Sequence, residues 1–315
     1  MGKAVQKVED ALLYLLVGLA AFILVAMLSL VVGVTVRGGL PVLSWRFLTT
    51  PPSIGMTAGG ISTAIFGTLA LVILMTLAVV PMGVLTAIYL AEYADRRSPL
   101  TRAIREAVET LASVPTIVFW LFGLGFFVQF LGRGIDSLFF RGELNYGQPA
   151  LIWSALTMAF LTVPVVIVET EQALSFIPGE QRLAAYSLGV SRWYTVSRLI
   201  LPQAFPGILS GTILALSRGA GEVAPIMFTG AAYYLPYLPT QPNDQFMELG
   251  YHIYVLATQS PDIELTKPLL FGTALVLLLL TFSLNLVALL IRRAMFQRLA
   301  RHRARQESPR TCEDF

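Results

Sequence analysis

Charge is scarce in this sequence, and that scarcity excludes most soluble folds. Only 13% of the 315 residues are Asp, Glu, Lys or Arg, about half of the roughly 25% that a soluble globular domain carries. By contrast, 56% are hydrophobic. Seven long segments contain no charged residue: 11–36, 47–91, 110–132, 144–168, 199–217, 223–243 and 268–291. Because about 20 apolar helical residues cross the hydrocarbon of a bilayer, the pattern excludes a large soluble enzyme and predicts a polytopic membrane protein.

The residues on which common catalytic and metal sites depend are also rare. The chain has three lysines, two histidines (His252 and His302) and one cysteine, Cys312. No segment fits the phosphate-binding loop of nucleotide hydrolases, the paired-histidine motif of zinc proteases or the serine elbow of α/β-hydrolases. A single cysteine excludes disulfides within the chain and cysteine-based metal sites. We therefore expect no catalytic residue, no metal and no cofactor bound by this chain.

The apolar segments predict an all-α protein with about six transmembrane helices, because lipid leaves every backbone polar group to be satisfied within the crossing segment. The expected spans are 11–36, 62–90, 108–131, 150–170, 203–231 and 269–291. The first is an uncleaved anchor, because it is long and lacks a small-residue cleavage site. The predicted divisions are an N-terminal anchor with an external loop (1–60), a transmembrane domain (61–293) and a cytoplasmic tail (294–315).

The loop charges orient these predicted spans. With both termini in the cytoplasm, sixteen lysines and arginines lie on the cytoplasmic side and five on the outer side. Positively charged loops favour the cytoplasmic face, so we expect a multi-pass membrane protein with both termini inside. The net charge is only +3, and basic residues at the membrane surface suit contact with anionic lipid better than binding of nucleic acid.

Arg218 and Glu222 are charged residues inside the fifth predicted span. They are four positions apart, which would place them on one face of a helix. At 1.5 Å per residue, Arg218 lies roughly 24 Å along a helix from Pro202. A charge at that depth is costly unless it faces protein or water. Two interpretations remain open: a buried ion pair that fixes helix packing, or a guanidinium that meets an anion in a translocation pathway, for which its parallel donors are suited.

The segment 180–202 between the fourth and fifth spans is amphipathic. Helical spacing places four apolar side chains on one face: Leu183, Tyr186, Val190 and Trp193. Gly189 would cost about 1 kcal/mol relative to alanine inside a helix, so it predicts a turn between two short helices. The pattern alone permits a helix that lies on the lipid headgroups or a helix that docks on a partner subunit.

The order of residues in this segment resembles the EAA loop of ABC importer permeases. Gly189 follows the pair Ala184-Ala185 by four positions, and Leu201-Pro202 comes twelve positions after the glycine. In that family the loop forms a coupling helix that docks on the ATPase subunit. The resemblance implies the fold of type I ABC importer permeases (MetI-like). It also implies these docking residues: Ala184, Ala185, Tyr186, Gly189, Val190 and Trp193.

Other segments are similar to Pst-type phosphate permeases, and above all to their PstA-type subunits. These segments are 218–225 (RGAGEVAP), 111–118 (LASVPTIV) and 252–258 (HIYVLAT). The similarity covers most of the chain from about residue 60 onward, and it implicates Arg218 and Glu222 in substrate passage. Three positions depart from the family pattern. Thr116 replaces the usual serine, Trp120 stands where a small residue is usual, and Val168 stands where a basic residue is common.

The resemblance implies a permease subunit that moves inorganic phosphate across the bacterial cytoplasmic (inner) membrane. ATP, with Mg, is then hydrolysed on a separate ABC ATPase dimer (PstB-like). The other expected partners are a sister permease subunit (PstC-like) and an extracytoplasmic phosphate-binding protein (PstS-like). The alternatives are an ABC permease for sulfate, molybdate or tungstate, an ion-coupled secondary transporter, and a structural or sensory subunit without transport. As a further hypothesis, Glu222 accepts the proton of hydrogen phosphate, which sulfate lacks.

Overall fold

The computed structural model describes residues 2–53, 58–95, 97–260 and 262–307, and its long elements are all helices. Within these residues, β-structure is confined to two isolated bridges. Six helical segments are long and apolar enough to cross a membrane: Asp10–Gly39, Ser62–Tyr93, Thr116–Phe139, Leu151–Ser175, Arg192–Gly219 and Ile263–Ala294. The predictions of an all-α architecture and of six transmembrane helices are confirmed.

Three helices form the core of the bundle: α3 (Ser62–Ile88), α7 (Leu151–Ser175) and α10 (Leu201–Gly219). α7 packs against both α3 and α10, and its most apolar stretch is two-thirds buried. Lipid is as apolar as these side chains, so close packing holds such helices together. Gly207 illustrates this, because a Cβ at that position would lie 2.6 Å from the Cβ of Ala173 in α7.

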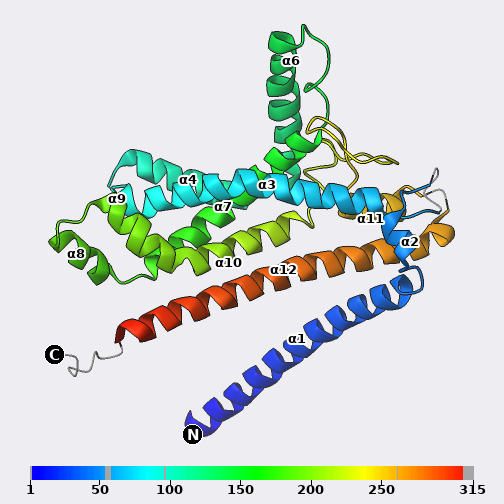
Figure 1. Cartoon of the computed structure of the whole chain (residues 1–315). Helices are drawn as coiled ribbons and strands as arrows, with labels where there is room; N and C mark the ends of the chain where they lie inside the picture. The colour runs from blue at the N-terminus through cyan, green and yellow to red at the C-terminus, as the bar shows by residue number, and fades with distance from the viewer. Residues whose placement is uncertain (1, 54–57, 96, 261, 308–315) are drawn as a thin grey trace.

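Two long helices lie at the edge of this core (Figure 1). α12 (Ile263–Glu307) packs against α10, and α1 (Gly2–Gly39) packs against α12, where Gly38 and Gly39 approach Phe271. From residue 10 to residue 34, every side chain of α1 is exposed. The beginning of α1 and the end of α12 lie at the same end of the bundle as α8 (Gly179–Ser187), whereas α2 (Trp45–Thr49) and α11 (Leu249–Thr258) lie at the opposite end.

The third span begins later than predicted. Instead of one helix over 108–131, the structure has a separate helix and then a helical run: α4 (Pro99–Ser113), followed by α5 (Thr116–Phe122), η2 (Gly123–Gly132) and α6 (Arg133–Phe139). The break falls at Pro115, which has no backbone N–H to donate and which disfavours helical backbone at the residue before it. Val114 is accordingly extended, with ψ 131°. α4 packs against α7 and does not belong to the span.

The fifth span both begins and ends earlier than predicted. Instead of 203–231 it comprises α9 (Arg192–Tyr194), the π-helical η3 (Thr195–Ile200) and α10. Pro202 lies in the first turn of α10, where its fixed φ and missing N–H are tolerated, so the helical run passes through it. At the other end α10 stops at Gly219, because Gly221 and Pro225 disfavour a longer helix. Residues 220–248 are irregular.

The last helix extends beyond the predicted membrane segment. α12 continues without interruption to Glu307, past the predicted start of the tail at residue 294. Residues 308–315, including Cys312, lie outside the described residues. The division of the chain into anchor, transmembrane domain and tail stays a prediction.

Candidate docking segment and substrate pathway

The predicted docking residues lie on short elements that project from one end of the bundle (Figure 1). α8 carries Ala184, Ala185 and Tyr186, and none of its residues is buried. Gly189 follows with φ +75°. Side chains strongly disfavour this left-handed conformation, whereas glycine adopts it readily. The predicted turn at Gly189 is therefore confirmed.

As the predicted turn requires, the four apolar residues of this segment are divided between α8 and the chain beyond it. Because the chain turns at Gly189, Leu183 lies on α8 and Trp193 lies on α9, beyond the turn. The large apolar side chains nevertheless remain in the open. Leu183 is 66% exposed, Leu188 83% and Trp193 68%. The segment therefore leaves three large apolar side chains uncovered at the end of the bundle, which makes it a candidate interaction surface.

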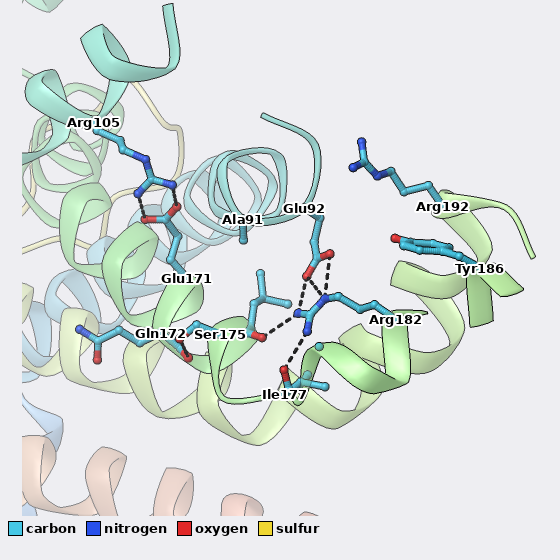
Figure 2. Close-up of a pocket in the computed structure, with 12 residues that line it drawn as sticks. Ala91, Glu92, Arg105, Glu171, Gln172, Ser175, Ile177, Arg182, Tyr186 and Arg192 are labelled. Carbon is cyan, nitrogen blue, oxygen red and sulfur yellow. Dashed lines mark hydrogen bonds and ion pairs between the residues drawn. The ribbon is translucent and has the colours of Figure 1, made fainter. Parts of the chain in front are cut away.

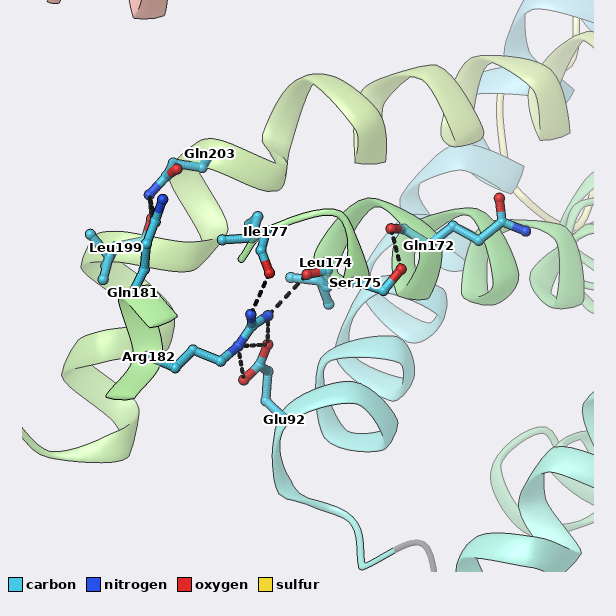
Figure 3. A network of polar contacts seen from close by, with 9 residues as sticks. All are labelled: Glu92, Gln172, Leu174, Ser175, Ile177, Gln181, Arg182, Leu199 and Gln203. Carbon is cyan, nitrogen blue, oxygen red and sulfur yellow. Dashed lines mark hydrogen bonds and ion pairs between the residues drawn. The ribbon is translucent and has the colours of Figure 1, made fainter. Parts of the chain in front are cut away.

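A buried ion pair fixes α8 to the bundle (Figure 2). Nη2 of Arg182 lies 2.6 Å from Oε1 of Glu92, and Nε donates to both carboxylate oxygens at 3.2 Å. Glu92 belongs to η1 (Tyr89–Tyr93), the π-helical end of the second span, and its side chain is 4% exposed. The same guanidinium donates to the carbonyl oxygens of Leu174 at 2.9 Å and Ile177 at 2.7 Å (Figure 3).

A second ion pair lies beside the first, across a cleft of about 590 Å³ (Figure 2). Arg105 of α4 contacts Glu171 of α7, with Nη2 and Oε1 2.9 Å apart, and also donates to the carbonyl oxygen of Leu90 at 3.2 Å. Arg192 lies over the ring of Tyr93, 5.6 Å from its centroid. The ends of the second and fourth spans are thus joined to α4 on one side and to α8 on the other.

Arg218 and Glu222 come together, but not on one helix face as predicted. Arg218 occupies the last turn of α10, whereas Glu222 follows the end of that helix in the irregular segment. Nε of Arg218 lies 3.8 Å from Oε1 of Glu222, and among the described residues this is the only polar contact of the guanidinium. The Arg218 side chain is 53% exposed and that of Glu222 is 25% exposed.

The neighbours of Arg218 place it at the level of the transmembrane helices. A Cβ on the adjacent Gly219 would lie 2.8 Å from the side chain of Met75, which is well inside α3, and 3.5 Å from that of Met158 in α7. On the other side, Ser217 donates a hydrogen bond to Asn285 of α12. A charge among membrane spans is rare and normally faces protein or water, so the exposed guanidinium requires such surroundings.

The chain after Glu222 is held against the beginning of α7. The N–H of Ala150 donates to the carbonyl oxygen of Thr229 at 2.8 Å, and the hydroxyls of Ser154 and Thr229 are 3.0 Å apart. The Phe228 ring packs on the ring of Trp120, with centroids 4.5 Å apart. Trp120, which departs from the family pattern, therefore packs against this segment. These contacts fix the backbone that carries Glu222.

Two buried ionisable residues lie next to this segment: Glu248, which sequence reasoning did not single out, and His252, which begins the family-like segment 252–258. Glu248 is 2% exposed and caps α11, because its carboxylate accepts the N–H groups of Gly250 at 2.8 Å and Tyr251 at 2.6 Å. Burial raises the pKa of Glu248 to about 7 and lowers the pKa of His252 to about 4. Nδ1 of His252 has no hydrogen-bond partner among the described residues. A Cβ on Gly250 would lie 3.0 Å from Val223.

Sequence reasoning missed the Arg182–Glu92 pair because its members are 90 positions apart. Arg182 counted only as one of several positive loop charges, and Glu92 only as the end of a charge-free segment. The sequence does show a carboxylate directly after an apolar span and an arginine at the beginning of the docking loop. It does not show that these two residues contact each other. Glu248 carried a weaker signal, since a lone acid beside apolar residues is also typical of exposed loops.

The fold and these sites define a class: six-span membrane proteins with a projecting docking segment at one end of the bundle and a half-exposed arginine among the spans. Comparison with known families is more specific. The family described as "Binding-protein-dependent transport system inner membrane component" matches residues 80–301. The chain belongs to this family.

Relatives of known sequence support this assignment. The chain is 32% identical over 296 residues to the probable ABC transporter permease protein YqgI of Bacillus subtilis (strain 168), covering 90% of this chain and 95% of that protein. It is 33% identical over 236 residues to the phosphate transport system permease protein PstA 1 of Mycobacterium tuberculosis (strain ATCC 25618 / H37Rv), covering 75% and 70%. A probable PstA of Methanocaldococcus jannaschii is 29% identical, covering 90% and 93%.

Solved structures share the fold. A chain of a bacterial ABC transporter involved in the import of the acidic polysaccharide alginate superimposes with a TM-score of 0.64 and 17% identity, covering 91% of this chain and 96% of that one. A chain of the MetNI methionine ABC transporter gives a TM-score of 0.58 and 16% identity, covering 75% and 95%. The expected MetI-like permease architecture is confirmed by these likenesses.

Proposed function

We propose that this chain is a permease subunit of an ABC importer and that it moves inorganic phosphate across the bacterial cytoplasmic membrane. The observation that carries the proposal is the state of Arg218. Its guanidinium lies among the transmembrane helices, is 53% exposed, and has one carboxylate contact at 3.8 Å. The relatives named as phosphate transport permeases give the substrate class.

An arginine in this state is suited to binding an oxyanion. The contact with Glu222 runs through Nε, so the two Nη groups remain available to donate two parallel hydrogen bonds to a tetrahedral anion. In a helix that faced lipid, the same side chain would cost about 2.5–3.5 kcal/mol on insertion scales. A water-filled path between this chain and a sister permease subunit removes that cost, because water solvates the guanidinium. The same path lets an anion reach the exposed side of Arg218.

Glu222 gives the site a means to distinguish anions. Its carboxylate lies beside the guanidinium and is 25% exposed, so it can accept a hydrogen bond from a protonated oxyanion. Hydrogen phosphate carries such a proton near neutral pH, whereas sulfate does not. A fully ionised anion such as sulfate has no proton to donate to the Glu222 carboxylate. The two negative charges would then repel each other, which disfavours sulfate.

The projecting segment supplies the attachment for energy coupling. The exposed side chains of Leu183, Leu188 and Trp193 suit the apolar cleft of a partner better than headgroup contact, because α8 projects beyond the ends of the core helices (Figure 1). The partners in this proposal are an ABC ATPase dimer beneath α8, a sister permease and an extracytoplasmic phosphate-binding protein. The end of the bundle that carries α8 then faces the cytoplasm, as do both termini.

Reconstitution of the full complex in proteoliposomes tests this function. With the cognate binding protein outside and ATP inside, the proposal predicts uptake of phosphate that requires ATP, and much slower uptake of sulfate, molybdate and tungstate. ATP-independent uptake driven by an ion gradient would instead identify a secondary transporter. Uptake of another oxyanion in preference to phosphate would keep the ABC assignment and replace the substrate.

A further inference from the structure

Arg182 closes a loop that would otherwise act as a hinge. α7 ends at Ser175 and α8 begins at Gly179, so only residues 176–178 connect the fourth span to the docking segment. The Arg182 side chain reaches back and donates to the carbonyl oxygen of Leu174, in the last turn of α7, and to that of Ile177, within the connection (Figure 3). The connection and the side chain together form a closed ring that limits rotation of α8 about α7.

The same guanidinium also ties α8 to the second span. Glu92 is presented by η1, where the N–H of Ala94 donates to the carbonyl oxygen of Tyr89, five residues earlier. A π-helical turn contains about one residue more than an α-helical turn, and Glu92 lies within this turn, in contact with Arg182. Every nitrogen of the guanidinium is engaged, with five hydrogen bonds in total.

This pair stays closed for an electrostatic reason. The Glu92 side chain is 4% exposed, so separation from Arg182 would leave a buried, uncompensated carboxylate, which is strongly unfavourable. Arg105 secures the other side of the same junction by contacts with Glu171 and the carbonyl oxygen of Leu90. A force applied to α8 therefore moves the ends of the second and fourth spans before it breaks this junction.

We propose that Arg182 and Glu92 form a latch that transmits the movement of the ATPase-docked segment to the second and fourth spans. Arg182 is thus a positioning residue for coupling: it contacts neither substrate nor nucleotide, and it makes α8, α7 and the end of α3 move as one body. The inference rests on the proposed function, since it requires an ATPase docked at α8. It adds a role for two residues that the docking motif does not include.

The test measures coupling in the full complex, reconstituted in proteoliposomes with the phosphate-binding protein and inorganic phosphate. ATP hydrolysis and phosphate uptake are measured on the same preparation for Arg182→Ala, Arg182→Lys and Glu92→Gln. We expect each variant to assemble and hydrolyse ATP, while phosphate moved per ATP falls by about tenfold, within the 5–150-fold range typical of coupling between sites. The double variant Glu92→Gln/Arg182→Ala should be no worse than the poorer single variant, because partners in one contact are not additive.

A matched control is available at the opposite end of the molecule. Lys267 and Glu264 form an exposed ion pair at 3.4 Å, and such pairs contribute little, so Glu264→Gln should keep the wild-type ratio of phosphate to ATP. The latch is overturned if assembled Arg182 and Glu92 variants keep that ratio, or if hydrolysis and uptake fall in parallel. It is also overturned if even Arg182→Lys prevents assembly, since the residue would then be purely structural. Failure of the proposed function would appear separately, as absence of phosphate uptake by the wild-type complex.

Discussion

Arg182 and Arg218 place the same chemical group in opposite situations within one bundle. Arg182, at the end of the bundle that carries α8, makes five hydrogen bonds with its carboxylate and carbonyl partners. Arg218, at the end of α10, has one polar contact at 3.8 Å within the part of the chain that the structure describes, and its side chain is half-exposed. A guanidinium whose three nitrogens all donate to protein oxygens holds structure in place. One whose donors are free retains binding capacity for a ligand.

The comparison separates two tasks that a permease must combine. The docking end has to transmit force, which requires contacts that do not open during the cycle. The pathway has to bind an anion and release it, which requires contacts that an incoming oxygen can replace. The carboxylates follow the same division, since Glu92 is 4% exposed and bidentate whereas Glu222 is 25% exposed and distant from its partner.

The largest expected effect on phosphate uptake comes from replacing Arg218, whose guanidinium has most of its donors available. Arg218→Gln should lower phosphate uptake by about 100-fold or more, because two charge-assisted hydrogen bonds of about 1.5–3 kcal/mol each are lost. Basal ATP hydrolysis by the assembled complex should remain, since Arg218 is far along α10 from the docking segment. Arg218→Lys keeps the charge without the parallel donors, so its phosphate uptake should lie between that of the wild type and that of Arg218→Gln. Wild-type uptake by Arg218→Gln would show that the arginine serves packing alone.

Glu222→Gln should have a smaller effect on the same assay. We expect phosphate uptake to fall by about tenfold, the loss expected when one hydrogen bond to a charged group is weakened. Competition by sulfate should increase, because a carboxamide does not repel a fully ionised anion. Unchanged phosphate uptake together with unchanged sulfate exclusion would remove Glu222 from the pathway.

At the docking end, Gly189→Val should weaken association with the ATPase by about fivefold or more, because a β-branched residue in the left-handed region costs at least about 1–2 kcal/mol. Gly189→Asn should lose less, since asparagine tolerates that conformation. Gly179→Ala is the control, because a Cβ there would meet open space and its φ is not positive. Affinity measured with purified ATPase in detergent provides the readout; equal affinity for all three variants would contradict the turn's role.

The smallest effect concerns the buried pair beside the pathway. The pKa of Glu248 is raised to about 7, so its contribution to stability is lost as pH rises from about 4.5 to 7. The pKa of His252 is lowered to about 4, so its contribution is lost as pH falls from about 6.5 to 4. The two slopes oppose each other, and the melting temperature of the wild-type protein should vary little across this window.

Substitution of either residue should reveal the slope of the other. Glu248→Gln should become less stable toward low pH, and His252→Gln less stable toward neutral pH, each by a few degrees in melting temperature. Thermal unfolding in detergent between about pH 4.5 and 7 measures both. Identical pH profiles for the two variants would contradict this description of the site. Unlike Arg182, His252 has a buried nitrogen without a hydrogen-bond partner among the described residues.

The sequence predicted the bundle better than the breaks in it. Hydropathy located all six spans because lipid imposes the same requirement on each segment. Hydropathy placed the beginning of the third span too early, because the residues on both sides of Pro115 are apolar and a hydropathy average does not register the helix break at a proline. It also carried the fifth span past Gly219, because the irregular segment after that residue is equally apolar. These boundaries depend on proline and glycine backbone preferences and not on hydrophobicity.

The candidate sites divide in the same way. Arg218 and Glu222 were identified because charge inside an apolar run is conspicuous, although their shared helix face was wrong. Gly189 was recognised because glycine has a specific backbone role. Arg182 and Glu92 could not be paired, because a contact between residues 90 positions apart depends on how the second and fourth spans pack.

The most direct test of the account asks whether Arg218 faces water in the assembled complex. The chain has one cysteine, Cys312, so Cys312→Ser gives a background for Arg218→Cys. A small charged thiol reagent should label this position in at least one nucleotide state. Leu24→Cys on the apolar α1, where the native side chain is 66% exposed, should stay unlabelled because it faces lipid or protein. Failure of the reagent to reach position 218 in every nucleotide state would contradict the pathway.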